Sequence, residues 1–303
     1  MPALKVLITG GSGLLGQYLN KELSRNFEIL TLYNENRGNC GEFNSARVDI
    51  LDTKCLKEVF QAFHPGVVVH TAAVSNSEKA AKMPDGKVAA VNVGAAKNIA
   101  ALCEKFNSKM IFTSTDLVYD GSLGMMLKED AALKPASLYA ETKLLGEEAV
   151  KAETGNYIIL RTSLLYGLGL YHSRCHFHGM YESLKERRAV KLFYDQFRTP
   201  LSLSDAAEII GSLCQKDISG EVINFGGKER VSRYGLGSIL CEISGFDRSL
   251  LKAVSMNETP DLNGVKDVSM DTAILRSSGI EQKTIRESIA GIISDNRKKI
   301  RTL

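Results

Sequence analysis

Short apolar runs, many of them β-branched, alternate with amphipathic stretches through the first 165 residues. Several runs are apolar on both faces, as in Val67-Val68-Val69, which is typical of parallel strands covered by helices on each side. The predicted strands are Lys5–Thr9, Glu28–Leu32, Ala46–Ile50, Gly66–Ala72, Lys109–Thr113 and Tyr157–Thr162. The predicted helices are Leu14–Ser24, Lys54–Phe63, Lys87–Phe106 and Leu138–Lys151. This alternation predicts an α/β fold with a doubly wound, Rossmann-like parallel sheet.

After about residue 167 the regular alternation ends. The predicted elements there are a mixed segment His172–Arg188, a strand Val190–Phe193, a helix from Ser204, a strand Glu221–Phe225, a helix from Ser232 and a last helix near Lys283–Asn296. We expect a dinucleotide-binding domain made of residues 1–166 and about 197–226. We expect the remainder, about 167–196 and 227–303, to form a small C-terminal substrate-binding lobe over the carboxyl edge of the sheet.

Composition narrows the partners and the compartment. A formal net charge of +3 with scattered Lys and Arg gives no electrostatic case for nucleic acid, although anionic small ligands fit. The six cysteines are widely spread without a CxxC pair, which favours reduced thiols and the cytoplasm. The first apolar run is too short for a secretory signal, and no stretch of about 18 apolar residues predicts a membrane span.

A glycine-rich turn follows the first strand, in Thr9-Gly10-Gly11-Ser12-Gly13-Leu14-Leu15-Gly16. Gly10, Gly13 and Gly16 have GxxGxxG spacing between a strand and a helix. Without side chains the turn is tight, a pyrophosphate approaches the backbone, and the helix start offers N–H groups to the anion. A glycine triplet alone also fits an ordinary turn, but this context predicts dinucleotide binding.

A second group of residues has the chemistry for carbonyl reduction. Thr115 ends the fifth strand, and Tyr139 and Lys143 follow at i,i+4 spacing on one helix face. We expect Tyr139 to donate a proton, the Lys143 ammonium to lower the Tyr139 pKa, and Thr115 to hold the carbonyl oxygen. A second YxxxK pair, Tyr181 with Lys185, lies outside the alternating region and is interpreted as a solvated pair.

The end of the second strand bears on the choice of cofactor. An NAD site favours a carboxylate there to bind the ribose hydroxyls, whereas this strand runs into Asn34. Arg37 lies close enough in sequence to meet a 2′-phosphate, while Glu35 argues for NAD(H). On balance the sequence favours NADP(H) over NAD(H).

Three of the five histidines cluster with a cysteine as His172, Cys175, His176 and His178. The residue types suit zinc, but a structural zinc site usually draws on two separated ligand pairs, and no second pair is evident. We therefore predict no metal. The cluster is interpreted either as plain structure or as a loop over the substrate that contacts nucleotide phosphates.

The order of TGGSGLLG, HTAA, STDLVYDG, YAETKLLGEE and LRTSLLYG resembles the extended short-chain dehydrogenase/reductase family, and within it the dTDP-4-dehydrorhamnose reductase group. The resemblance covers about residues 4–210. It implies Thr115, Tyr139 and Lys143 as the catalytic triad. For the cofactor it implies the turn residues Gly10, Ser12, Gly13, Leu14, Leu15 and Gly16, then Asn34, Arg37, Asp49, Ile50, Thr71, Ala72, Ala73, Asn92 and Arg161. As substrate contacts we predict Asp116, Ser163 and Gln196 from these motifs, and His176 and Arg198 in addition to the family pattern.

Differences within these motifs affect the expected substrate. The related sugar dehydratases have Asp-Glu after the catalytic Thr, whereas this chain has Asp116-Leu117, which disfavours dehydration. Leu164 stands where the rhamnose-forming reductases usually have a tryptophan, and Ala73 where they have a tyrosine. Arg198 replaces the glycine of a QFGTP segment. The sugar pocket is therefore altered.

The resemblance implies reduction of a 4-keto, nucleotide-linked sugar. Two alternatives stay open. A nucleotide-sugar epimerase would use the same triad and retain its cofactor. A regulatory subunit similar to the β subunit of methionine adenosyltransferase, which resembles the same reductases, would bind NADP without turnover. A homodimer is left open.

Overall fold

The computed structural model describes residues 3–75, 83–84, 86–258 and 264–301. Seven strands form one parallel sheet in the order β11-β6-β5-β4-β1-β2-β3, which is the doubly wound arrangement predicted above. Their bounds are β1 Lys5–Thr9, β2 Glu28–Tyr33, β3 Ser45–Arg47, β4 Val67–His70, β5 Lys109–Thr115, β6 Tyr157–Thr162 and β11 Glu221–Phe225.

The strand order reverses at β1. The chain moves from β1 outward to β2 and β3, then returns to place β4 on the other side of β1, with Val6 opposite Val67 and Thr9 opposite His70. Crossovers on either side of β1 then leave the sheet in opposite directions. In open α/β sheets this reversal leaves a crevice outside the carboxyl ends of the two strands, where ligands bind.

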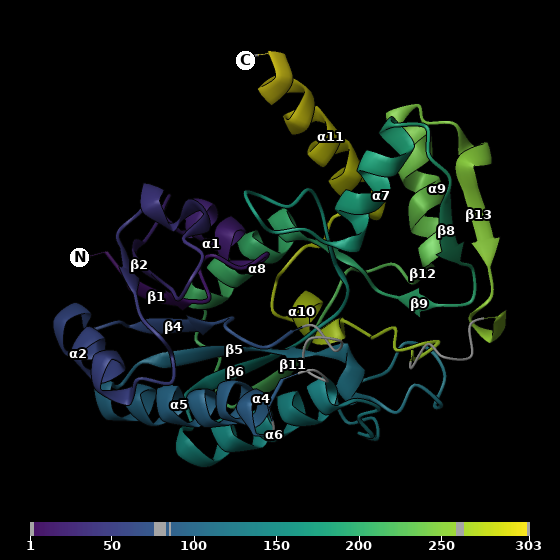
Figure 1. The fold of residues 1–303 in the computed structure, drawn as a ribbon. Coiled ribbons are helices and arrows are strands. Elements are labelled where there is room, and N and C mark those ends of the chain that lie inside the picture. Colours follow the sequence, from purple (N-terminus) through teal and green to yellow (C-terminus); the bar gives the residue numbers. More distant parts are fainter. Residues whose placement is uncertain (1–2, 76–82, 85, 259–263, 302–303) are drawn as a thin grey trace.

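Helices cover both faces of the sheet (Figure 1). One core cluster joins the sheet to α1 (Gly16–Leu23) and α8 (Leu203–Gln215). The other joins it to α2 (Thr53–Phe63), α5 (Ala95–Phe106) and α6 (Leu138–Glu153). The apolar runs of β1 and β4 are buried because their alternate side chains enter these two cores in turn.

Two predicted elements differ from the structure. The strand predicted as Ala46–Ile50 ends at Arg47, because the Asp49 side chain accepts a hydrogen bond from Leu51 N at 3.0 Å and begins a turn. The helix predicted as Lys87–Phe106 is divided into α4 (Lys87–Ala89), a π-helical turn η2 (Ala90–Gly94) and α5. Such π turns inside helices are often found at functional sites.

A second group of elements lies beside the carboxyl edge of the sheet (Figure 1). It has its own apolar core, built from α7 (His176–Lys185), β8 (Val190–Phe193), α9 (Arg233–Ser244), β13 (Leu251–Val254) and α11 (Ile285–Arg301). β13 was not predicted, because the C-terminal sequence is polar. It pairs in parallel with β8. Leu275 of α10 (Ala273–Ser277) and Ile280 instead join the core under α1 and α8.

The remaining elements are short and lie between the longer ones. They are η1 Gly38–Glu42, η3 Asp116–Val118, β7 Leu165–Tyr166, β9 Phe197–Arg198, β10 Leu201–Ser202, β12 Val231–Ser232, η4 Arg248–Leu250 and η5 Met256–Glu258. Among the helices in the described ranges, none has the length and apolar character needed to cross a bilayer.

Candidate active site

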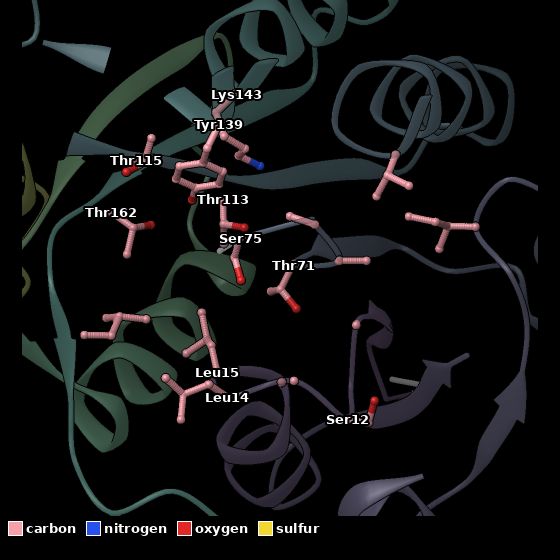
Figure 2. Close-up of a pocket in the computed structure, with 18 of the residues that line it drawn as sticks. Ser12, Leu14, Leu15, Thr71, Ser75, Thr113, Thr115, Tyr139, Lys143 and Thr162 are labelled. Atoms are coloured by element: carbon pink, nitrogen blue, oxygen red, sulfur yellow. The ribbon is translucent and has the colours of Figure 1, made fainter. Parts of the chain in front are cut away.

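A cleft of about 860 Å³ opens at the carboxyl edge of the sheet, where the strand order reverses. Figure 2 shows Ser12, Leu14 and Leu15 of the glycine turn on one side of it, and Thr115, Tyr139 and Lys143 on the other. The predicted site residues that line it are Gly10, Ser12, Gly13, Leu14, Leu15, Gly16, Asn34, Asp49, Ile50, Thr71, Ala72, Ala73, Thr115, Asp116, Tyr139, Lys143, Ser163 and Arg198. The fold thus gathers most of the predicted site in one place.

The glycine turn is shaped for a ligand by its backbone. Gly10 has a φ of +70°, and a Cβ at Gly16 would lie 2.1 Å from the Gly10 carbonyl oxygen, so these two glycines are required by the turn itself. Helix α1 starts without a side-chain cap, unlike α2, α6, α8 and α9. Because the uncapped N–H groups and the helix dipole face the cleft, the residues present fit the pyrophosphate of a dinucleotide.

The end of β2 offers amide and acidic groups to the cleft. Asn34 and Glu35 line it, whereas Arg37 does not. The exposed Arg37 side chain lies over Gly41, where a Cβ would be 2.7 Å from its Nε. Arg47, which the sequence did not single out, donates from Nε to the Asn34 carbonyl oxygen at 3.0 Å. The structure therefore places a cation beside Asn34, but it is a different arginine from the one predicted.

The catalytic candidates are positioned by two element ends. β5 ends at Thr115, whose Oγ1 accepts from Leu117 N at 3.3 Å and donates to Asp116 Oδ1 at 3.2 Å. Helix α6 begins after Ser137, whose Oγ accepts from Ala140 N at 3.2 Å. This cap fixes the first turn, so Tyr139 and Lys143 both face the cleft (Figure 2).

Burial controls the protonation of these groups. It raises the pKa of Tyr139 to about 12, with Asp116 adding to the rise and a hydrogen bond with Thr115 opposing it. Burial also lowers the pKa of Lys143 to about 7, against the attraction of Glu147. The Lys143 ammonium position lies 4.1 Å from the centroid of the Phe112 ring. The expectation that Lys143 lowers the Tyr139 pKa is therefore wrong for this structure: burial dominates, and the amine is only partly charged at neutral pH.

The lowered pKa of Lys143 predicts a pH dependence of cofactor binding. Below pH about 7 the free protein carries an ammonium here, which favours an anionic cofactor, and above it the amine is neutral. NADPH affinity should therefore fall as the pH rises above about 7, when dissociation constants are measured between about pH 6 and about pH 9. Lys143→Met should flatten the profile. A profile that is equally steep in both proteins would contradict this assignment.

A buried charged group continues the cleft beyond Thr115. Asp116 is 5% exposed; burial raises its pKa, while Arg198, Thr115, Arg233 and Ser163 oppose the rise. Arg198 Nε lies 3.5 Å from Asp116 Oδ2, and its other nitrogens donate to the carbonyls of Val265, Lys266 and Phe197. Arg198 is thus fixed in place where the resembling family has a glycine.

Arg233 was missed by the sequence analysis. It lines the same end of the cleft, and its Nε donates to Gln196 Oε1 at 2.9 Å. In the part of the chain that the structure describes, Arg233 Nη1 is buried without a hydrogen-bond partner. Burial, then the nearby Arg198, lower the pKa of Arg233 to about 10. Two guanidinium groups beside Asp116 make this end of the cleft suited to an anion.

Two predicted residues lie away from the cleft. Arg161 points toward α6, where it pairs with the fully buried Glu147 at 2.9 Å, and it donates to the Tyr119 hydroxyl at 3.0 Å. Asn92 of the π turn is buried; it accepts from Val74 N at 2.9 Å and donates to Thr142 Oγ1 at 3.0 Å. Neither residue is part of the cleft lining, although both were predicted to lie beside the cofactor. They support the loop after β4 and the strand β6 instead.

Gln196 and His176 are also outside the cleft lining. Gln196 holds Arg233, as described above, and His176 is exposed. His178 Nδ1 accepts from Gly169 N at 2.8 Å, and its Nε2 lies 2.9 Å from Glu182 Oε1. His172 and Cys175 line the cleft. Within the described ranges, no three His, Cys, Asp or Glu side chains gather closely enough to hold a metal ion.

Further residues line the cleft without having been predicted as its contacts. They are Leu32, Tyr33, Asn36, Val48, Leu51, Ser75, Met83, Lys87, Val91, Thr113, Ser114, Leu117 and Leu165, in addition to Arg233. Most carry no distinctive pattern, since any apolar or hydroxyl side chain suits a cleft wall. Leu164 is the position at which the sequence differs from the resembling reductases, so its place in the lining supports an altered pocket.

Comparison with known proteins places these features in a family. A family model described as "RmlD substrate binding domain" matches residues 4–297. The "Methionine adenosyltransferase 2 subunit beta" of Rattus norvegicus is 27% identical over an alignment 312 residues long, which covers 98% of this chain and 90% of that protein. A "dTDP-4-dehydrorhamnose reductase" of Aggregatibacter actinomycetemcomitans is 26% identical over an alignment 279 residues long, which covers 90% of this chain and 88% of that protein.

Solved structures agree with the fold. A dTDP-4-dehydrorhamnose reductase from Bacillus anthracis in complex with NADP has a TM-score of 0.84 and 23% identity, covering 97% of this chain and 100% of that one. A dTDP-4-dehydrorhamnose reductase ortholog from Clostridium acetobutylicum has a TM-score of 0.83 and 25% identity, with the same coverage. The similarity therefore extends over both the sheet and the smaller lobe.

Proposed function

Because the chain belongs to the RmlD substrate binding domain family, within the extended short-chain dehydrogenases/reductases, we propose that it reduces a keto group of a nucleotide-linked sugar with NADPH. The coarser statement, an NAD(P)-dependent oxidoreductase of this type, follows from the family. The more specific proposal, reduction of a sugar keto group, rests on the convergence of Thr115, Tyr139 and Lys143 across the cleft from the glycine turn.

The bound nicotinamide supplies a hydride for the carbonyl carbon. Tyr139 donates the proton to the carbonyl oxygen, and its pKa of about 12 keeps the hydroxyl protonated throughout the physiological range. Thr115 orients the carbonyl, because its hydroxyl lies within hydrogen-bonding reach of Tyr139 at the end of β5. Lys143 holds the ribose of the cofactor from the next turn of α6. The apolar wall at Leu164 and Leu165 keeps water from this face.

The arginines support a nucleotide diphosphate as the carrier of the sugar. Arg198 and Arg233 both interact with Asp116, which is next to Thr115 in the chain, so an anion held between them lies close to the reacting carbonyl. In such a substrate the keto group at C4 and the diphosphate at C1 are separated by one sugar ring. This arrangement suits a carbonyl beside Thr115 and an anion beside Arg198 and Arg233. With Leu164 and Ala73 in the lining, the sugar need not be dTDP-4-dehydrorhamnose itself.

The test is a screen of nucleotide-linked keto sugars, with oxidation of NADPH by the purified protein as the readout. Turnover of one of them, lost in Tyr139→Phe, would support the proposal. The regulatory alternative has its own observation, the 27% identity to a methionine adenosyltransferase subunit over 98% of this chain. Tight NADPH binding without turnover of any sugar would favour that alternative. Interconversion of sugar epimers without net NADPH oxidation would favour an epimerase.

We expect NADPH to bind more tightly than NADH. Asn34 rather than a carboxylate follows β2, and the nearby cations are Arg47, which donates to the Asn34 carbonyl oxygen, and the exposed Arg37. A charge-assisted contact is worth roughly 1.5–3 kcal/mol, or about 10- to 150-fold in affinity. Titration of both cofactors measures the ratio. Arg37→Gln and Arg47→Gln combined should remove most of it, and each single variant measures the share of its arginine. Equal affinities in the unaltered protein would count against NADP(H).

A further inference from the structure

The segment between β7 and α7, residues 167–175, crosses from the smaller lobe to the nucleotide-binding body; we call it the strap. It carries His172 and Cys175 into the lining of the cleft. It is a tightly folded piece of chain: Ser173 N donates to the Leu170 carbonyl at 2.9 Å, and a Cβ at Gly169 would lie 1.9 Å from the Ser173 carbonyl oxygen. These contacts hold the strap together as one folded unit.

The strap is fastened to helix α1 beside the glycine turn. Tyr18 donates from its hydroxyl to the Leu168 carbonyl at 2.6 Å. The Gln17 side chain is fully buried, and its Nε2 donates to the Leu170 carbonyl at 3.2 Å, to Ser173 Oγ at 2.8 Å and to the Ser12 carbonyl at 3.0 Å. One amide group thus joins the strap to the turn that would hold the pyrophosphate.

Further contacts complete the attachment on either side. The Tyr171 hydroxyl donates to Glu42 Oε1 in η1, which places the exposed tip of the strap against the nucleotide-binding body. At the other end, Gly169 N donates to His178 Nδ1 of α7. Burial raises the pKa of Tyr18 to about 12, so its hydroxyl remains a donor at neutral pH. Most of these fastening groups do not line the cleft themselves, so they act on the ligand through the strap.

We propose that the strap is a gate for the dinucleotide, with Tyr18, Gln17 and Tyr171 as positioning residues that keep it closed. His172 and Cys175 of the strap line the same cleft as Ser12 and Gly13 of the glycine turn, so a cofactor held on that turn would pass the strap as it enters and leaves. The inference rests on the cofactor-binding part of the proposed function, but not on the identity of the sugar. It applies equally to a reductase, an epimerase or a binding subunit.

A gate has a kinetic signature that a binding contact lacks. Weakening the fastening raises the open fraction of the free protein and the opening rate of the complex together. Both the association and the dissociation rate constants then increase, while the dissociation constant changes little. Loss of a direct contact instead raises the dissociation rate and the dissociation constant by the same factor.

The experiment uses stopped-flow fluorescence of NADPH with the full chain. The double variant Tyr18→Phe/Tyr171→Phe removes two hydroxyls that fasten the strap and keeps both rings. We expect both rate constants to rise about tenfold, and the dissociation constant to change by less than about threefold. The matched control is Tyr181→Phe, whose hydroxyl accepts from Asn296 Nδ2 within the smaller lobe, and its rates should be unchanged. The melting temperature of each variant checks that the fold is intact.

Unchanged rate constants in the double variant, or a dissociation constant that rises in step with the dissociation rate, would overturn the gate. Either result with normal NADPH binding leaves the proposed reductase function standing. If the unaltered protein does not bind NADPH at all, the gate and the proposed function fail together. A strap gate with no sugar turnover in the screen would support the gate and contradict the reductase.

Discussion

Replacing Tyr139 with phenylalanine should lower turnover on the true keto sugar by at least about 10²–10⁴-fold, the range typical of general acid catalysis. The change removes one oxygen and keeps the ring, which packs at the start of α6 between the cleft and the helix. NADPH affinity and the melting temperature should therefore change little. The measurement is the steady-state rate of NADPH oxidation at saturating cofactor.

The chain provides its own control in the second YxxxK pair. Tyr181 stacks edge-on against Phe246, and its hydroxyl accepts from Asn296 in the smaller lobe. Tyr181→Phe makes the same chemical change outside the cleft, so it should leave the rate nearly intact. Equal turnover in Tyr139→Phe and the unaltered protein would exclude Tyr139 as the proton donor.

The fold was largely predictable because its signals are local. The strands predicted as Lys5–Thr9, Tyr157–Thr162, Glu221–Phe225 and Val190–Phe193 are confirmed at both ends. Their apolar runs are bounded by polar or turn residues, which mark where burial stops. β13 was missed because only part of it is buried: Lys252 and Ala253 face solvent, so the strand shows no apolar run. Its partner strand, β8, lies 61 residues earlier in the chain, so this pairing could not be predicted from local pattern.

The site residues also differ in how far they could be predicted: some are fixed by local sequence pattern, and others by contacts between distant parts of the chain. Tyr139 and Lys143 line the same cleft because helix periodicity places them on one face of α6 and the end of β5 lies beside that face. Both features can be recognised from the local sequence. Arg161 pairs with Glu147 of α6 and does not line the cleft, and this contact depends on how α6 packs on β6, which the local pattern does not reveal. Arg233 could not be found, because its position beside Arg198 depends on the antiparallel pairing of β12 with β9. The pKa of Tyr139 depends on burial that the i,i+4 spacing does not reveal.

The other large effect concerns the glycine turn, where two glycines have different reasons to lack a side chain. At Gly16 a Cβ would lie 2.1 Å from the Gly10 carbonyl oxygen and 2.7 Å from the Gly11 Cα, both backbone atoms that cannot move without opening the turn. Gly16→Val should therefore fail to fold or unfold at a much lower temperature. At Gly13 the nearest atom to a Cβ is the Gly10 carbonyl oxygen at 3.1 Å, a tight contact that a small shift relieves.

Gly13→Val should accordingly keep the fold and lose the cofactor. The branched side chain enters the part of the cleft lined by Ser12, Leu14 and Leu15, where the pyrophosphate would meet the start of α1. Overpacking of this kind costs about 1–3 kcal/mol, and lost charge-assisted contacts to the N–H groups add roughly 1.5–3 kcal/mol. Together they predict a loss of NADPH affinity of at least about 100-fold. Fluorescence titration measures it, with the melting curve of the same sample showing the fold intact. Wild-type affinity in folded Gly13→Val would mean that the anion does not lie on this turn, and cofactor binding would then have to be sought elsewhere in the cleft.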